Sequence, residues 1–152
     1  MNLTECLKEL NIELPGPSPL QLPFAAGVVS GNLVFLSGQT PTVDGVPQYK
    51  GIVGSTVSVE EAQKAAEVCT LNLLAALRDL TGLDRIKRVV KVNGYVASDP
   101  AFTGQPQVIN AATTMLNGIF GEALPHARAA VGVAALPGGV SVEIEMVVEL
   151  ED

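Results

Sequence analysis

The chain has 152 residues, of which 47% are hydrophobic and 16% are charged, and its formal net charge is −7 at pH 7. This length and composition fit a single domain over residues 1–152 with a sizeable core, and they exclude a disordered chain. No apolar run reaches the roughly 18 residues of a membrane span, and the acidic balance opposes nucleic-acid binding, so we expect a cytoplasmic protein with neither membrane nor nucleic-acid partners.

The residue types give little support to metal or nucleotide chemistry. One histidine, His126, and two distant cysteines, Cys6 and Cys69, cannot assemble a zinc-type cluster. The chain contains no G-x-x-x-x-G-K-[ST], G-x-G-x-x-G or G-x-S-x-G string, so phosphate cradles, dinucleotide sites and a nucleophile elbow are not supported. We therefore expect no metal, and the chemistry of the protein must use other residues.

The first part of the chain predicts a short helix and a tight hairpin. Asn2 and Glu5 form a capping pattern beside leucines at helical spacing, which predicts a helix over 3–10. A proline-rich stretch follows and imposes an irregular connection. The apolar, partly β-branched runs 24–29 and 33–37 flank a Ser-Gly-Asn turn, so we expect them to pair as a hairpin.

The middle of the chain predicts a loop, a long helix and a strand. Glycines, prolines and an aspartate make 38–56 a loop. Ser58 and Glu61 form an S-x-x-E capping box ahead of an apolar stripe, which predicts a helix over 59–80. The β-branched run 86–97 lacks helical spacing and indicates a strand.

The last part of the chain predicts one more helix and two strands. Pro106 suits a first helical turn, and the apolar stripe behind it indicates a helix over 106–120. Segments 127–136 and 140–150 are expected to be strands that pair as a hairpin around a Pro-Gly-Gly turn. The order ββαβαββ then predicts an α+β sandwich, in which two helices cover one face of a mixed sheet.

The last two strands provide a candidate site. Pairing them as a hairpin places Glu143 and Glu145 on the face that also carries Arg128 and three small residues, Ala130, Gly132 and Ala134, and leaves an apolar face for the helices. Arg128 is the only Lys or Arg after residue 91. A guanidinium beside small residues indicates a cavity for a carboxylate or a contact with a partner subunit; the alternative is that Arg128 pairs with a nearby glutamate.

The block from His126 to Glu145, HARAAVGVAALPGGVSVEIE, resembles the signature of the RidA/YjgF reactive intermediate deaminase family, also called L-PSP endoribonuclease-like. The resemblance extends through segment 37–41, SGQTP, and through Asn110, and covers about residues 22–150. It implies a chorismate mutase-like fold and a homotrimer whose sites lie in the clefts between subunits.

The resemblance also implies an activity: hydrolysis of small 2-imino or 2-enamino acids to 2-keto acids and ammonia, without a metal or organic cofactor. It implies that Arg128 holds the substrate carboxylate, that main-chain groups of Gly38 and Ala130 help to place it, and that Glu143 positions the attacking water. Such a reaction needs an anchored carboxylate, an aimed water and a proton route. The alternative role for Glu143 is structural, as a strand carboxylate that satisfies Arg128 and neighbouring amides.

Several positions depart from the family pattern or have open roles. Phe24 stands where many members have tyrosine, and Ala130 where several have cysteine, which excludes thiol chemistry there. For His126 we consider both proton transfer and hydrogen bonding at the mouth of the site. Asn110 is expected to make a helix-side hydrogen bond near the cleft, and Ser37, which has no base beside it in the motif, a hydrogen bond at a strand end.

Other functions compete with deamination. A non-catalytic carboxylate-binding or regulatory protein would use the same Arg128 pocket. A dedicated deaminase of one intermediate, such as 2-aminomuconate, is left open by Phe24 and by an expected N-terminal extension over 1–19. An L-PSP-type endoribonuclease is opposed by the single histidine and by the acidic chain.

Overall fold

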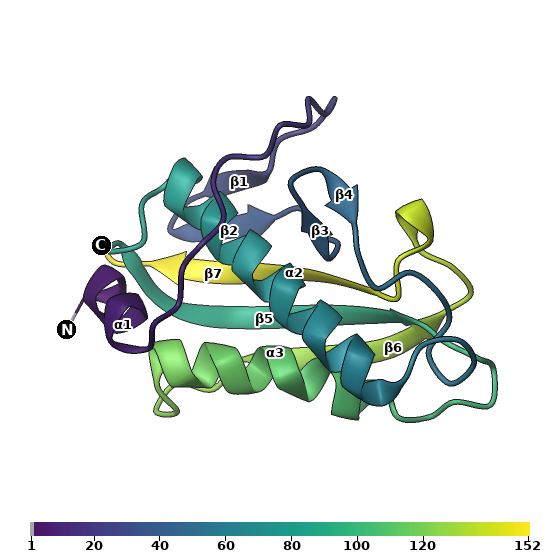
Figure 1. The fold of residues 1–152 in the computed structure, drawn as a ribbon. Helices are drawn as coiled ribbons and strands as arrows, with labels where there is room; N and C mark the ends of the chain where they lie inside the picture. Colours follow the sequence, from purple (N-terminus) through teal and green to yellow (C-terminus); the bar gives the residue numbers. More distant parts are fainter. Residues whose placement is uncertain (1) are drawn as a thin grey trace.

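Two long helices, α2 (Val59–Leu80) and α3 (Gln105–Phe120), cover one face of a five-stranded sheet (Figure 1). The computed structural model describes residues 2–152; Met1, the first residue of the expected extension, lies outside the described part. A short helix, α1 (Leu3–Glu9), lies near the end of α3. No helix in residues 2–152 is both long enough and apolar enough to cross a membrane.

The helices begin where the sequence places their caps. In α1 the Asn2 side chain accepts a hydrogen bond from the main-chain N–H of Glu5, 2.8 Å away. In α2 the Ser58 hydroxyl accepts from the Glu61 N–H, and the Glu61 carboxylate returns a bond to the Ser58 N–H. These bonds satisfy N–H groups that a helix start leaves unpaired. The predicted helices are thereby confirmed to within a residue or two at each end.

The main sheet has the strand order β1-β2-β7-β5-β6, and its strands are β1 (Gly27–Ser30), β2 (Leu33–Leu36), β5 (Ile86–Ala97), β6 (Ala127–Val133) and β7 (Val142–Leu150). Only the β5–β6 pair is parallel. A second hairpin, β3 (Thr42–Val43) with β4 (Val46–Pro47), lies inside the segment predicted as a loop. The α+β class with a mixed sheet is confirmed.

The predicted hairpin between the last two strands is wrong, because β5 lies between β6 and β7. At the end of β5, the N–H of Ala97 bonds Ser141 and the N–H of Ser98 bonds Val133. The Pro-Gly-Gly turn is present as a 3-10 turn, Pro137–Gly139, within a longer connection that passes this end. The order β5-α3-β6 is a strand–helix–strand unit, and such units place their strands in parallel.

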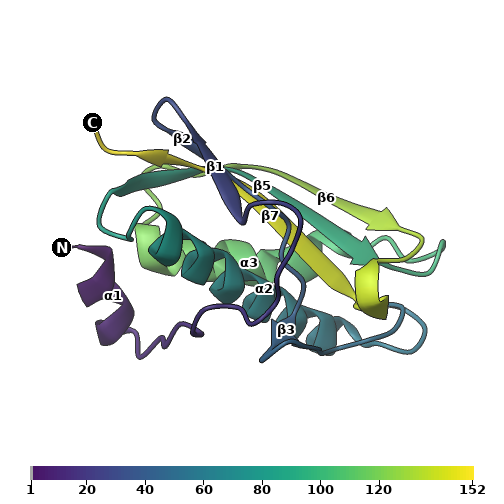
Figure 2. The ribbon, with the colours of Figure 1, turned by 90° about the horizontal axis from the view of Figure 1, so that it is seen from above.

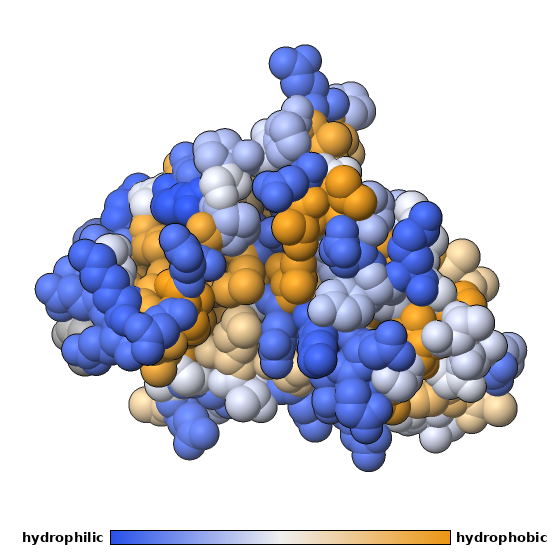
Figure 3. Space-filling model, viewed as in Figure 1, coloured by the Kyte–Doolittle hydropathy of each residue, from blue (hydrophilic) through white to orange (hydrophobic). Residues whose placement is uncertain are grey.

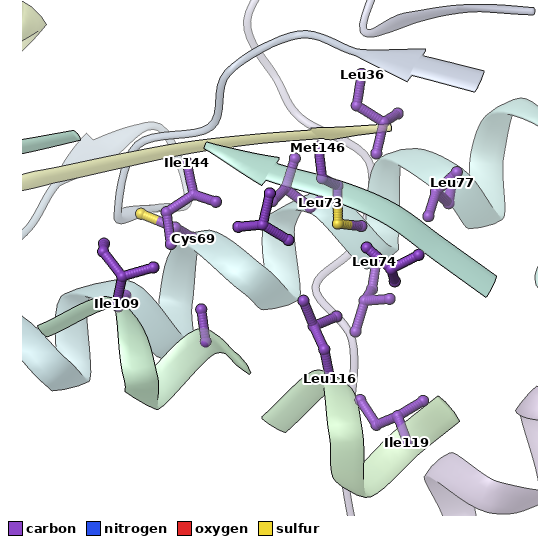
Figure 4. Close-up of a cluster of buried hydrophobic side chains, with 14 of the residues drawn as sticks. Leu36, Cys69, Leu73, Leu74, Leu77, Ile109, Leu116, Ile119, Ile144 and Met146 are labelled. Atoms are coloured by element: carbon purple, nitrogen blue, oxygen red, sulfur yellow. The ribbon is translucent and has the colours of Figure 1, made fainter. Parts of the chain in front are cut away.

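The hydrophobic core fills the space between the sheet and the two long helices. Figure 4 shows side chains of α2 and α3 pointing toward those of β7 and β2, among them Leu73, Leu77, Ile109, Leu116, Ile144 and Met146. Leu3 and Leu7 of α1 join this core. The helix-side surface in Figure 3 shows hydrophobic patches between hydrophilic ones.

The other face of the sheet is uncovered in the single chain. Figure 2 shows both long helices on one side of the strands and no element packed across the opposite side. Several large apolar side chains are exposed on this bare face, with exposed fractions of 58% for Val28, 48% for Phe35 and 45% for Val131. An apolar sheet face of this kind is typical of a surface that another chain covers.

The contact of α3 with the sheet depends on a glycine in β5. Gly94 lies opposite Ala130 of β6 and Ile144 of β7, and a Cβ atom added to it would stand 2.5 Å from two carbons of Ile109. Real Cβ atoms essentially never make contacts that short, so the Ile109 side chain of α3 packs directly on the main chain of β5 at this point.

Gly94→Ala should therefore destabilise the protein by about 1–3 kcal/mol, because the added methyl group must push α3 away from the sheet. The matched control is Gly118→Ala, since a Cβ at Gly118 in α3 would meet nothing within 4 Å. That change should be neutral or stabilise by up to about 1 kcal/mol through helix propensity. Urea unfolding measures both, and equal stabilities for the two variants would contradict the close contact.

Candidate active site

Arg128 extends from β6 toward α3. Its Nη1 donates hydrogen bonds to the side-chain oxygens of Asn110, at 2.7 Å, and Thr113, at 3.1 Å. These two residues are three positions apart on α3 and share one face of the helix. Nε and Nη2 of Arg128 make no hydrogen bond within residues 2–152. Nε and Nη2 together form an edge that can grip a carboxylate with two parallel hydrogen bonds.

A depression of about 280 Å³ opens beside this guanidinium. It lies between α3 and the start of β6, and its lining consists of Asn110, Thr113, Asn117, Pro125, His126 and Arg128. The lining includes one arginine and no carboxylate. The depression is therefore suited to a small anion, with Arg128 as the charge that binds it.

His126 lies at the rim of this depression, two residues before Arg128. Its Nδ1 is 3.1 Å from the carbonyl oxygen of Ala127, and its Nε2 is buried without a hydrogen-bond partner in the described part of the chain. The segment before His126 is held by Arg88, whose Nη2 donates to the carbonyl of Pro125 at 3.2 Å. Arg88 thus contributes to the position of the rim, a role that sequence patterns did not indicate.

Glu143 occupies the bare face of the sheet. It lies on β7 opposite Tyr95 of β5, and a Cβ added to Gly38 would stand 3.0 Å from its Oε2. Burial raises the pKa of the Glu143 carboxyl, and the charge of Glu145 raises it further. A half-buried carboxylate of this kind is suited to exchange a proton with a bound water.

Glu145 has a different environment on the same face. Its Oε1 accepts hydrogen bonds from the Tyr95 hydroxyl at 2.6 Å and from Asn93 Nδ2 at 3.2 Å. The bond to Glu145, followed by burial, raises the pKa of Tyr95 to about 12. The Tyr95 hydroxyl therefore remains a hydrogen-bond donor at neutral pH.

The sequence prediction that Arg128 shares a face with Glu143 and Glu145 is wrong. Arg128 lies opposite Val92 on the helix side of the sheet, whereas Glu143 lies opposite Tyr95 on the bare side. Because β5 separates β6 from β7, the hairpin pairing that would place these glutamates on the face of Arg128 does not form. The alternative in which Arg128 pairs with a glutamate is also contradicted, since its partners are on α3.

The small residues of β6 are explained by α3 rather than by a cavity floor. A Cβ on Gly132 would stand 2.7 Å from Gln105 Nε2 and from Ser98 Oγ. Ala130 packs against the hydrophobic core. A side chain at residue 132 would force Gln105 or Ser98 to move. Ala130 thus lies on the same side as Arg128, while Gly38 lies beside Glu143.

The remaining predicted residues lie around the start of the sheet. The Ser37 hydroxyl donates to the carbonyl of Ala25 at 2.6 Å, which ties the end of β2 to the segment that carries Phe24. Phe24 is 58% exposed. Asn72 of α2, which sequence patterns did not single out, donates to the carbonyls of Thr40 and Thr42 and so holds the segment that follows Gly38.

The protein is thus an α+β protein with one sheet face uncovered, and it carries Arg128 on the helix side of the sheet and Glu143 on the bare side. The sequence profile described as Endoribonuclease L-PSP matches residues 17–150. Protein TCP17 of Trypanosoma cruzi is 40% identical over 148 residues, which are 96% of this chain and 92% of that protein. The chain therefore belongs to the L-PSP family, which is also the RidA/YjgF family.

Solved structures of similar proteins agree with this assignment. Atu1372, a protein of unknown function from Agrobacterium tumefaciens, is 43% identical with a TM-score of 0.87, and the match covers 99% of this chain and 92% of that chain. RidA from the Antarctic bacterium Psychrobacter sp. PAMC 21119 is 26% identical with a TM-score of 0.62 and coverages of 90% and 94%. The family prediction is confirmed.

Glu143→Gln should raise the thermal stability of the single chain near neutral pH, because folding places the charged carboxylate in a half-buried position beside Glu145. A carboxyl whose pKa is raised by folding makes the native protein less stable as the pH rises from the ordinary carboxyl pKa through the raised one. The glutamine variant lacks this loss, so its gain in melting temperature should be small at about pH 4 and larger at about pH 7.

The control is Glu149→Gln on the same strand and face, where the carboxylate lies 3.9 Å from Lys87 Nζ. This variant should show no gain that grows with pH. A lower melting temperature for Glu143→Gln at about pH 7 would contradict the unfavourable burial of its charge.

Proposed function

We propose that the protein hydrolyses small 2-imino and 2-enamino acids to 2-keto acids and ammonia, in the cytoplasm and without a cofactor. The observation that carries this proposal is the arrangement of Arg128, which lines a depression free of carboxylates and which α3 holds through Nη1, while Nε and Nη2 make no hydrogen bond within residues 2–152. The chemistry needs an anchor for one carboxylate, and this arrangement supports such a role. Membership of the RidA/YjgF family supports it as well.

In the proposed reaction Glu143 acts on water. Its carboxylate takes a proton as the water oxygen bonds to the imine carbon, and it returns that proton to the nitrogen. Glu143 then takes the hydroxyl proton of the resulting carbinolamine and delivers it to the nitrogen while the carbonyl forms and the carbon–nitrogen bond breaks, so that imino acid and water give a keto acid and ammonia. The raised pKa of Glu143 supports this role because a group that both takes and gives a proton works best near the operating pH.

The opposite orientations of Arg128 and Glu143 favour a site shared between two protomers. One chain cannot bring them to the same small substrate, because they lie on different faces of its sheet. A second copy that covers the bare face could place its Arg128 beside the Glu143 of the first. The exposed apolar side chains of that face and the low charged fraction support such an assembly, and we propose that it is a homotrimer.

Two other functions use the same residues less fully. A carboxylate-binding protein without activity would need Arg128 but gives no role to the half-buried Glu143. An endoribonuclease would have to bind a polyanion with a chain of net charge −7 and a single histidine for acid–base work. An RNA digestion assay beside the deaminase assay tests the second of these functions.

Arg128→Lys tests the proposed function. Lysine keeps the charge but loses the planar two-pronged grip, so kcat/KM for a freshly generated 2-imino acid should fall roughly 10- to 100-fold. Release of ammonia and keto acid measures the rate. Arg78→Lys is the control, because Arg78 pairs with Asp79 on α2 and does not line the depression. Full activity in Arg128→Lys, or no activity in the native protein, would contradict the proposal.

The shared site predicts complementation between two weakened variants. Light scattering should give about three times the chain mass, as a homotrimer requires. When Arg128→Lys and Glu143→Gln chains are unfolded together and refolded in equal amounts, about one quarter of the sites combine both native residues, if each site takes one from each of two chains.

Activity of the mixture should therefore recover to about a quarter of the native value. The control is the same two variants mixed after separate refolding, without exchange of subunits. No recovery in the refolded mixture would place both residues of each site in one chain, which contradicts the shared site.

A further inference from the structure

The bare face carries two carboxylates, Glu143 and Glu145, and the Tyr95 hydroxyl bonds the one that does not lie directly opposite it. Glu143 and Glu145 alternate with buried residues along β7 and point to the same side, about 7 Å apart as i and i+2 positions of a strand. Tyr95 of β5 lies directly opposite Glu143, yet its hydroxyl donates to Glu145 Oε1 at 2.6 Å. Asn93, which lies opposite Glu145, donates to the same oxygen.

The two carboxylates are therefore unequal. Hydrogen bonds that donate to a carboxylate stabilise its charged form, and Glu145 accepts two of them. For Glu143, burial and the charge of Glu145 both favour the protonated form, and no hydrogen bond within the described residues opposes them. When two interacting carboxylates differ in this way, the first proton goes to the one without donors.

We propose that Tyr95 and Asn93 are positioning residues that keep Glu145 ionised, so that Glu143 is the member of the pair that takes up and releases the proton. This inference rests on the proposed hydrolysis, in which the proton comes from the attacking water and goes to the departing nitrogen. Glu145 itself neither touches the reacting atoms nor exchanges a proton in this step.

Within one chain the groups around Glu143 leave the charge of Glu145 as the main electrostatic influence, and the Arg128 that the proposed assembly would bring beside Glu143 is the same in the native protein and in each variant below. On β6, the residues of the same face opposite Asn93 and Tyr95 are Ala129 and Val131, which carry no charge. Gly38 covers the carboxylate from the end of β2.

Two other ionisable groups nearby, Lys91 and Cys69, do not offset the effect of the Glu145 charge on Glu143. Lys91 of β5 lies opposite Val147, beyond Glu145 along the strand. Beneath β7, Cys69 is fully buried, and its pKa is raised well above the ordinary thiol value by burial, so it remains neutral.

Titration of the glutamate carboxyl carbons by NMR tests the inference on the full-length protein labelled at glutamate. In the native protein the pKa of Glu143 should lie above the ordinary carboxyl value. In Glu145→Gln the midpoint of Glu143 should move to lower pH, because the neighbouring negative charge is gone. Glu149→Gln is the control, since Glu149 lies on the same strand and face but beside Lys87, and it should leave the midpoint of Glu143 in place.

Tyr95→Phe provides a second variant that keeps both carboxylates. Loss of the hydroxyl removes one of the two donors that stabilise the negative charge of Glu145, so the midpoint of Glu143 should move to lower pH. The inference is overturned if both variants leave the midpoint of Glu143 unchanged.

The pH profile of turnover separates this inference from the proposed function. In Glu145→Gln the acid limb of the pH profile, which the ionisation of Glu143 controls, should move to lower pH. If Glu145 had only a structural role, the variant would change the maximum rate but not the position of this limb. If the carboxyls titrate as expected but the native protein releases no ammonia, the proposed function fails and the order of ionisation stands. If turnover is present and the limb does not move, the role of the pair in catalysis is overturned.

Discussion

Helix α3 can rest on the sheet only because Gly94 of β5 has no side chain at the point where Ile109 approaches. This close approach determines much of the rest of the molecule. It requires small residues on β6, where Gly132 meets Gln105. It also brings Asn110 and Thr113 of α3 against Arg128. Arg128, the only Lys or Arg after residue 91, is therefore held by hydrogen bonds to two uncharged side chains instead of by a salt bridge. The position of Arg128 therefore depends on the close packing of α3 against β5 and β6.

The limits of the sequence prediction follow from what local patterns contain. The capping box at Ser58 and the β-branched run 86–97 place their elements correctly because caps and periodicity are local properties. The Pro-Gly-Gly turn is also local, but it does not say whether a third strand occupies the place beside β7. Alternate residues of β6 are small or apolar on both faces, so alternation could not assign a face to Arg128. Arg128 could be identified from the sequence because it is the only Lys or Arg after residue 91. Tyr95 could not, because a tyrosine is an ordinary residue in a strand.

The sheet separates two kinds of electrostatic environment by the thickness of one layer. On the helix side, a guanidinium borders a depression that has no negative group. On the bare side, two carboxylates lie among apolar side chains, with a tyrosine and an asparagine as the donors to one of them. Within one chain these environments neither neutralise nor perturb each other directly. The positive environment on the helix side and the negative environment on the bare side are complementary in charge, so identical chains can bind each other by joining one side to the other.

This separation has a consequence for how the proposed activity depends on the amount of protein. Each folded chain carries Arg128 on one face and Glu143 on the other, so if the proposed shared site forms, an isolated chain holds two half-sites that point in different directions. Dilution below the dissociation constant of the assembly would then remove activity while every chain stays folded, because association rather than folding completes the site. The rate would fall more steeply than the protein concentration, and the level of expression would itself regulate the enzyme.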